Sequence, residues 1–290
     1  MKVKKAVILC GGQGTRFLPV TKALPKEMLP VVDTPVLQYI VDEMAKSGIE
    51  EVCIVISPGK EAIERHFSAY PELEESLKAK GDLDRLEKIE NIGRGIKFTF
   101  LVQLHARGMA DALYLTKDFV GKDAFVLSTG DDLVVADEPV SKQMLSAFGP
   151  GIAAIIGGQT VPDEKIHLYG CAKLGEALPG CNRAHKCITL VEKPKVEDAP
   201  SRFAALGRYV LTGEIFDKID MIQPDKKGEL QITDALKILC DEGKVCTYDF
   251  EGNRYDMGNK TGAVKATIDF ALRHPETAEE IKEYIKSLDL

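Results

Sequence analysis

The chain has 290 residues, 44% of them hydrophobic, which is enough to bury a substantial core in one large or two modest domains. Its formal net charge of −7 argues against a general nucleic-acid or acidic-membrane surface. No apolar stretch approaches the length of a membrane span, no secretory leader precedes Ala6, and the seven cysteines form no C-x-x-C pair. We therefore expect a cytoplasmic protein with reduced thiols that neither crosses a membrane nor binds nucleic acid.

Residues 6–32 combine an apolar run with a glycine-rich loop. The run over 6–10 is typical of a buried parallel strand. Gly11, Gly12 and Gly14 follow it, and their backbone N–H groups are free of side-chain bulk. Such a loop can approach a phosphate chain and point its N–H groups at it.

Three basic residues, Arg16, Lys22 and Lys26, come after the glycines and alternate with prolines. Prolines at this density disfavour a regular helix and favour a stiff, extended segment. The sequence therefore predicts an anion-binding loop followed by a rigid cationic arm.

Two better-known glycine loops do not fit this segment. A Walker loop requires Gly-Lys-Ser/Thr, whereas Gly14 is followed by Thr15 and Arg16. The dinucleotide fingerprint requires a third glycine where this chain has Phe17, and it must open a helix. A simple glycine turn after a strand would leave Arg16 and Lys26 unexplained.

The next segment alternates helices and strands, which predicts a parallel α/β sheet. Residues 71–90 are charged and predict a solvated helical insertion. The other predicted elements are helices over 36–44 and from 61–67, with strands over 51–56 and 95–102.

Polar residues follow two of the predicted strands. Gln103 comes after the strand over 95–102, and residues 107–112 open a helix. Asp131 comes after the apolar strand over 124–128, at the kind of strand end where open α/β sheets bind ligands. Asp132 is adjacent and points elsewhere if the chain is extended there.

The second half of the chain begins after a break at 148–151. Thr233 and Asp234 are expected in a helix with a structural role. The predicted strands cover 188–191 and 245–250, and two helices separated by His274 and Pro275 follow residue 261. Pro194 ends the strand over 188–191, so the side chains of Glu192 and Lys193 are free to face one site.

The run G-G-Q-G-T-R-F-L-P-V-T-K-A-L-P-K-E-M-L-P resembles the signature of the sugar-1-phosphate nucleotidyltransferases. Its T-K-A-x-P-K-E-M-L-P part resembles the bacterial members that use UTP and glucose 1-phosphate. The resemblance spans nearly the whole chain. It implies an α/β fold with a Rossmann-like, mixed, mostly parallel central sheet flanked by helices, and an inserted sugar-binding part.

This resemblance also implies an organisation. We expect a single domain over 1–290, with a nucleotide-binding half over about 1–140 and a sugar-binding half over about 141–260. A C-terminal helical tail over 261–290 would support the sheet or a subunit interface. The expected assembly is a homodimer or homotetramer.

The resemblance implies roles for four sets of residues, which are given at the end of this paragraph. One departure from the family pattern falls in this region: the family often has Gly and His where this chain has Ala110 and Asp111. The Gln103 amide would match uracil, since it offers both a donor and an acceptor. The implied residues are Arg16, Lys26 and Lys193 for catalysis; Gly11, Gly12, Gly14, Thr15, Glu27, Gln103 and Gly108 for the nucleotide; Tyr169, Gly170, Glu192 and Lys193 for the sugar phosphate; and Asp131 and Asp256 for Mg²⁺.

The implied reaction joins UTP and glucose 1-phosphate to give UDP-glucose and pyrophosphate. Its nucleophile is a phosphate oxygen that is already ionised at neutral pH, so no general base is needed. A thymidylyltransferase or another sugar-1-phosphate nucleotidyltransferase remains an alternative. An inactive, nucleotide-sugar-binding regulatory module would be expected to lack one of the charged residues, and all of them are present.

Overall fold

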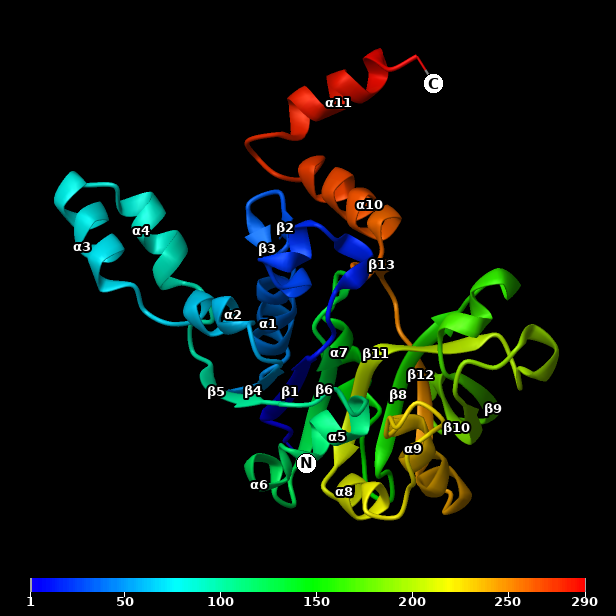
Figure 1. The fold of residues 1–290 in the computed structure, drawn as a ribbon. Coiled ribbons are helices and arrows are strands. Elements are labelled where there is room, and N and C mark those ends of the chain that lie inside the picture. The colour runs from blue at the N-terminus through cyan, green and yellow to red at the C-terminus, as the bar shows by residue number, and fades with distance from the viewer. Residues whose placement is uncertain (1, 290) are drawn as a thin grey trace.

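The computed structural model describes residues 2–289 and is built on one nine-stranded sheet (Figure 1). Its strands are β1 (Lys5–Cys10), β4 (Glu51–Ile56), β5 (Lys97–Val102), β6 (Ala124–Thr129), β8 (Ala154–Thr160), β9 (Cys171–Leu178), β10 (Cys181–Val191), β11 (Phe203–Thr212) and β12 (Val245–Asp249). They lie in the order β5-β4-β1-β6-β11-β8-β12-β10-β9.

The sheet is mixed, with a parallel core. β1 pairs in parallel with β4 and β6, β4 with β5, and β8 with β12. β11 runs antiparallel between β6 and β8, and β10 runs antiparallel to β12 and β9. The predicted α/β class with a central mixed sheet is confirmed.

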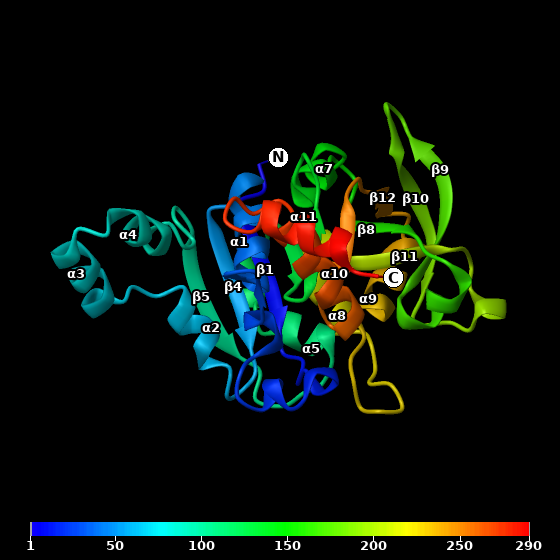
Figure 2. The same cartoon turned by 90° about the horizontal axis from the view of Figure 1, so that it is seen from above.

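Helices cover both faces of this sheet (Figures 1 and 2). The α-helices are α1 (Val36–Lys46), α2 (Glu61–His66), α3 (Pro71–Lys80), α4 (Leu83–Glu90), α5 (Met109–Tyr114), α6 (Lys117–Val120), α7 (Val140–Ser146), α8 (Glu214–Ile219), α9 (Ile232–Asp241), α10 (Lys260–Ala271) and α11 (Ala278–Ser287). Short 3₁₀ helices are η1 (Thr15–Phe17), η2 (Val20–Lys22), η3 (Lys26–Met28), η4 (Asp163–Leu168) and η5 (Val196–Asp198).

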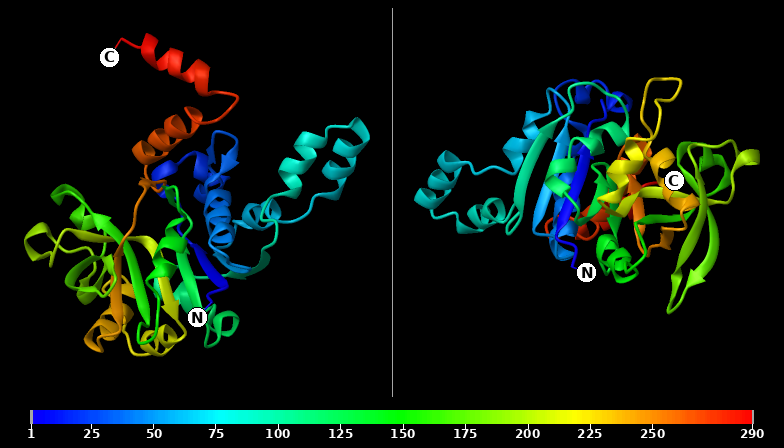
Figure 3. Two further views of the ribbon diagram at one scale, coloured as in Figure 1. Left: turned by 180° about the vertical axis from the view of Figure 1, so that it is seen from behind. Right: turned by 90° about the horizontal axis from the view of Figure 1, so that it is seen from below.

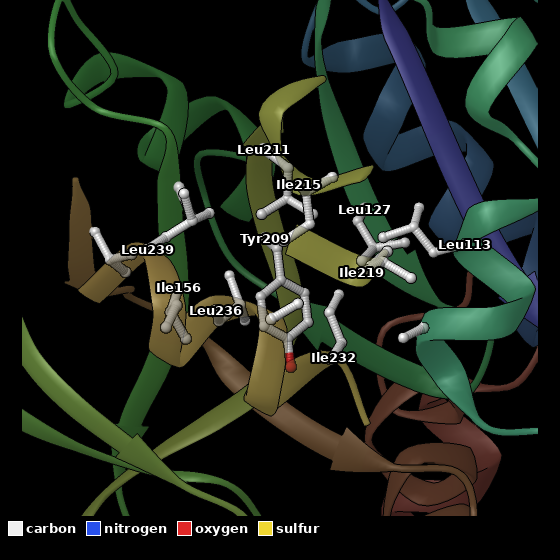
Figure 4. Close-up of a cluster of buried hydrophobic side chains, with 14 of the residues drawn as sticks. Leu113, Leu127, Ile156, Tyr209, Leu211, Ile215, Ile219, Ile232, Leu236 and Leu239 are labelled. Atoms are coloured by element: carbon white, nitrogen blue, oxygen red, sulfur yellow. The ribbon is translucent and has the colours of Figure 1, made fainter. Parts of the chain in front are cut away.

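Alternation along the strands divides the core into layers. In β1, Val7 packs on one face, while Ala6 and Ile8 pack on the other, because successive side chains point to opposite sides. Helices α5, α8 and α9 cover the first face, and Figure 4 shows their side chains meeting those of β6, β8 and β11. Helices α1, α2, α7 and α10 cover the second face.

A two-stranded sheet of β7 (Asp132–Val135) and β13 (Asn253–Asp256) joins distant parts of the chain. Asp132 lies directly opposite Asp256 in this antiparallel pair. The backbone N–H of Met257 also donates to the carbonyl of Asp131 over 2.9 Å. Two carboxylates separated by more than a hundred positions are thereby brought to one place. A second short pair, β2 (Pro30–Val31) with β3 (Thr34–Pro35), precedes α1.

A buried ion pair ties helix α1 to the middle of the sheet. The Arg208 guanidinium is fully buried in β11 and donates to Glu43 Oε2 over 2.8 Å and to the Asp132 carbonyl over 2.9 Å. Burial alone would raise the pKa of Glu43, but the charge and hydrogen bonds of Arg208 outweigh it and lower that pKa. Arg208 therefore holds α1, β7 and β11 together.

Two helical segments stand clear of the sheet. Helices α3 and α4 extend beyond the β5 edge and form the predicted helical insertion (cyan in Figure 3). Helix α11 follows α10 and has no buried side chain (Figure 1). None of the helices within residues 2–289 is long and apolar enough to cross a membrane.

The proline-spaced segment differs from the prediction. It was expected to be extended, but it folds into the three 3₁₀ turns η1 to η3. Gly14 supplies the left-handed conformation (φ 66°) that starts the first turn. Prolines lack the backbone N–H that a long helix needs for its hydrogen bonds, but a single 3₁₀ turn is short enough to form between them. The predicted strand over 188–191 is the end of β10, whereas β8, β9, β11 and helices α6, α7 and α8 have no counterpart among the predicted elements.

Candidate active site

The glycine loop after β1 forms one side of a cavity of about 470 Å³. Six of the expected residues line this cavity together with Gln13, Ala106, Glu229 and Gly258. Those six are Gly11, Gly12, Gly14, Thr15, Arg16 and Lys26. The loop and the start of the basic segment therefore share one site.

A buried lysine lies under this loop. The Lys60 ammonium donates to the carbonyls of Cys10 and Gly12 over 2.5 and 2.6 Å. It also contacts both carboxylate oxygens of Glu27 over 2.8 and 2.9 Å. Glu27 is only 1% exposed, and burial raises its pKa despite the nearby lysines. Lys60 thus neutralises a buried carboxylate and ties down two carbonyls of the loop.

Those two contacts determine where the loop's N–H groups point. In a trans peptide the C=O and the following N–H point in opposite directions. With the carbonyls of Cys10 and Gly12 held by Lys60, the N–H groups of Gly11 and Gln13 face away from it. Gly11 and Gln13 both line the cavity, so we expect these N–H groups to be directed toward it.

Charged groups of both signs meet at Gly258. A Cβ added to Gly258 would lie 2.9 Å from Asp256 Oδ1, 3.0 Å from Asp131 Oδ2 and 3.3 Å from an Arg16 guanidinium nitrogen. Lys26 forms a salt bridge with Asp131. Burial alone would lower the pKa of Lys26, but Asp131 and Glu27 hold it above its usual value, so Lys26 stays charged.

Asp132, which lies opposite Asp256 across the β7–β13 pair, forms a salt bridge with Arg254. The Arg254 guanidinium also donates to the Tyr169 hydroxyl over 2.9 Å and lies 4.9 Å from the centroid of its ring. Arg254 and Asp256 are two positions apart on β13, so they share a face of that strand. The strand that carries Asp256 is thereby connected to Tyr169.

Tyr169 begins a second loop, which is closed by backbone contacts. The N–H of Lys193 donates to the Tyr169 carbonyl over 3.1 Å, and a Cβ on Gly170 would lie 3.4 Å from Glu192 Oε2. Lys193 has φ 43°, a conformation rare outside glycine and found where a structure enforces it. Its ammonium lies 3.0 Å from Glu192 Oε1, so the two side chains are in contact.

Gln103 and Gly108 lie at the other border of the glycine loop. Gln103 is 6% exposed, and its Oε1 lies 3.0 Å from where a Cβ on Gly11 would be. A Cβ on Gly108 would collide with the Leu230 backbone at 2.5 Å, and the Leu230 N–H donates to the Arg107 carbonyl over 2.7 Å. The segment before α9 is therefore packed against the loop that carries Gly108.

The family model described as Nucleotidyl transferase matches residues 5–271. The chain belongs to this nucleotidyl transferase family. A UTP–glucose-1-phosphate uridylyltransferase of Staphylococcus epidermidis is 43% identical, and the match covers 100% of this chain and 99% of the relative.

Two solved structures are similar along almost their whole length. A UTP-bound UGPase from Acinetobacter baumannii has a TM-score of 0.89 at 34% identity, covering 99% of this chain and 100% of the other. A UDP-glucose pyrophosphorylase complexed with UDP-glucose has a TM-score of 0.83 at 34% identity, covering 94% and 100%. The nucleotidyltransferase fold expected from the sequence is confirmed.

Glu27 occupies a different place from the other members of the nucleotide-binding set. Both of its carboxylate oxygens contact Lys60 beneath the loop, so its position suits support of the loop rather than contact with a ligand. The other expected residues lie on the glycine loop, at Gly258, at the Tyr169 loop or beside Gly11, as described above.

Sequence reasoning missed Lys60, Arg254 and Glu229 as members of this region. Lys60 follows the predicted strand over 51–56, and a cation near a parallel strand end was the available signal. Arg254 stands two positions before Asp256, a spacing that places both on one face of a strand. No pattern near Glu229 indicates that it lines the cavity.

We expect Lys60→Met to raise the KM for UTP by about 10-fold or more, because hydrogen bonds to a charged group contribute about 1.5–3 kcal/mol each. The KM for the second substrate should change less, since within residues 2–289 the hydrogen bonds and salt bridges of Lys60 go to Cys10, Gly12 and Glu27 and none reaches the Tyr169 loop. Steady-state kinetics with each substrate varied in turn measures both effects. The matched control is Lys78→Met, which removes an exposed lysine of α3.

The double variant Lys60→Met/Glu27→Gln distinguishes two roles of Lys60: neutralising the Glu27 carboxylate and holding the loop carbonyls. It removes the unpaired carboxylate but does not restore the ties to the Cys10 and Gly12 carbonyls, so the KM for UTP should stay high. Recovery of the wild-type KM would show that Lys60 serves only to neutralise Glu27.

Proposed function

We propose that this protein transfers the uridylyl group of UTP to glucose 1-phosphate, giving UDP-glucose and pyrophosphate. The observation that carries this proposal is the convergence of Asp131, Asp256 and Arg16 around Gly258, beside the glycine loop that lines the cavity. The relatives that are 43% identical over the full chain support the choice of UTP and glucose 1-phosphate. Paired carboxylates, an arginine and a glycine loop suit a reaction between two phosphate esters.

The chemical problem in this reaction is electrostatic. The sugar phosphate is an anion and must approach the α-phosphate of a triphosphate. Two unit charges about 4 Å apart interact by about 4 kcal/mol at an effective dielectric of about 20, and several such repulsions act together. The attacking oxygen is already ionised at neutral pH, so the protein must offset charge rather than remove a proton.

The triphosphate would lie along the glycine loop. The Gly11 and Gln13 N–H groups would donate to its phosphate oxygens, as backbone N–H groups do in other phosphate-binding loops. Arg16 would stabilise charge on the departing pyrophosphate, and Lys26 would hold a phosphate beside Asp131. Interactions of this type accelerate the reaction when they are stronger in the transition state than with bound UTP.

The carboxylates fit Mg²⁺. Asp131 Oδ2 and Asp256 Oδ1 flank one point, and Mg²⁺ prefers oxygen ligands from one or two carboxylates together with substrate phosphates. Within residues 2–289 no cluster of three or more acidic, His or Cys side chains forms a complete metal site, which agrees with a site that the substrate completes. When bound, Mg²⁺ would neutralise phosphate charge between the two substrates.

The sugar phosphate would lie at the Tyr169 loop. Glu192 is suited to accept hydrogen bonds from sugar hydroxyls, and Lys193 to pair with the phosphate. Gly170 leaves room for a pyranose ring close to the backbone. Arg254 would keep Tyr169 in place relative to β13. The division into nucleotide and sugar halves, the homo-oligomeric assembly and the cytoplasmic location stay predictions.

We expect pyrophosphate release to be fastest with UTP and glucose 1-phosphate in a panel of UTP, dTTP and CTP against several sugar 1-phosphates. A pocket that rejects one methyl group gains only about 1–3 kcal/mol, so some activity with dTTP is expected. Equal rates with dTTP and UTP would favour the thymidylyltransferase alternative. Absence of pyrophosphate release with every pair would favour the regulatory module.

Asp131→Asn and Asp256→Asn should each lower kcat by about 10²-fold or more, because each removes charge from the group that holds the metal. Each change keeps the shape of the side chain, so the thermal midpoint should stay close to that of the wild type. The matched control is Asp123→Asn, which alters an exposed aspartate at the opposite end of β6. Turnover near the wild-type value at saturating Mg²⁺ would show that the altered residue does not hold the metal.

A further inference from the structure

The Gln103 amide is held by two acceptors. Its Nε2 donates to Asp111 Oδ2 over 2.8 Å and to the Gly108 carbonyl over 3.3 Å. A primary amide nitrogen has two hydrogens, so both are used within the protein. The carboxylate and the carbonyl can only accept, so the opposite orientation of the amide would place oxygen against oxygen.

The amide oxygen is left without a donor. Gln103 Oε1 accepts no hydrogen bond from residues 2–289, although the side chain is 6% exposed. It lies beside Gly11, on the border of the glycine loop. The backbone N–H of Gln103 donates to the Ile56 carbonyl over 2.8 Å, which fixes where the side chain starts. Gln103 therefore presents a hydrogen-bond acceptor to a ligand on this loop.

This arrangement differs from the expectation that the amide would offer a donor and an acceptor together. Asp111, in the first turn of α5, takes up the donor that would have completed the pair. We propose that Asp111 is a specificity-determining residue, which selects UTP over CTP by fixing the Gln103 amide with its oxygen toward the base. This inference rests on the proposed function, in which Gln103 contacts the base of the nucleotide.

The selection follows from the edges of the bases. Uracil carries a hydrogen on N3 that the Gln103 oxygen can accept, whereas cytosine has a bare N3 with a lone pair. An acceptor facing a lone pair is repelled and leaves both groups unpaired, and an unpaired buried polar group is costly. Thymine carries the same N3–H as uracil, so this contact does not separate UTP from dTTP.

The test measures kcat/KM for UTP, CTP and dTTP with the wild type and with Asp111→Ala. Without the carboxylate, only the longer contact with the Gly108 carbonyl, at 3.3 Å, opposes turning of the amide, so its N–H₂ group can more readily face the base, where it suits N3 of cytosine. The UTP/CTP ratio should narrow by about 10-fold, the size of one hydrogen bond to a charged group, and the UTP/dTTP ratio should stay unchanged. Each ratio is taken on one preparation, so a smaller fraction of folded protein does not alter it.

Two further variants sharpen the result. Asp111→Asn keeps an oxygen acceptor and should give a UTP/CTP ratio between those of the wild type and Asp111→Ala. Asp118→Ala removes an exposed aspartate of the following helix, α6, and should leave the ratio at the wild-type value. A UTP/CTP ratio that Asp111→Ala leaves unchanged would overturn the inference, as would equal narrowing by Asp118→Ala.

The Gln103→Ala variant tests the proposed contact with the base separately from the role of Asp111. If Gln103→Ala narrows the UTP/CTP ratio and Asp111→Ala does not, the base contact stands and the role of Asp111 is wrong. If Gln103→Ala leaves the ratio unchanged, the base lies elsewhere and the nucleotide site itself has been misassigned.

Discussion

The contact between Lys60 and the glycine loop is the constraint on which the nucleotide side of the site depends. A loop of three glycines has many accessible conformations, and ordering it costs conformational entropy. Lys60 fixes it from below through two carbonyls, and Glu27 supplies the charge that makes a buried ammonium tolerable. If the triphosphate binds as proposed, the loop is held in place before it arrives, and the loop's N–H groups would need little reorganisation on binding.

The other constraint is the small sheet of β7 and β13, which brings the two halves of the site together. Asp131 and Asp256 come from segments far apart in sequence and meet because Asp132 and Asp256 are opposite each other in this pair. Arg254 extends the connection to Tyr169, and Arg208 connects the Asp132 backbone to α1. In the proposed function, the sites for the two phosphates would consequently be held at one separation, which is what an in-line transfer requires.

Much of this structure could be predicted from the sequence, because the informative patterns are local. The glycines after β1, the carboxylate after β6 and the V-E-K-P turn after β10 each reveal their position through neighbouring apolar runs and prolines. The parallel strands β1, β4, β5 and β6 and the helices α1 and α2 follow from apolar runs and periodicity in the same way.

What could not be predicted depends on contacts between distant segments. Nothing near Lys60 shows that it lies under the glycine loop, and nothing near Arg254 shows that it reaches Tyr169. Asp111 was visible only as a departure from the family pattern, and its contact with Gln103 gives that departure a physical meaning. The 3₁₀ turns of the proline-spaced segment were missed because prolines exclude long helices and tolerate single turns.

The most direct test of this account is an NMR titration of the ¹⁵N-labelled protein with UTP and Mg²⁺. If Lys60 turns the loop's N–H groups toward the triphosphate, the amide signals of Gly11 and Gln13 should shift strongly and saturate together with UTP binding. Signals of remote loop glycines such as Gly149 and Gly180 should stay in place. Saturation with UTP that leaves the Gly11 and Gln13 amides unmoved would contradict the account.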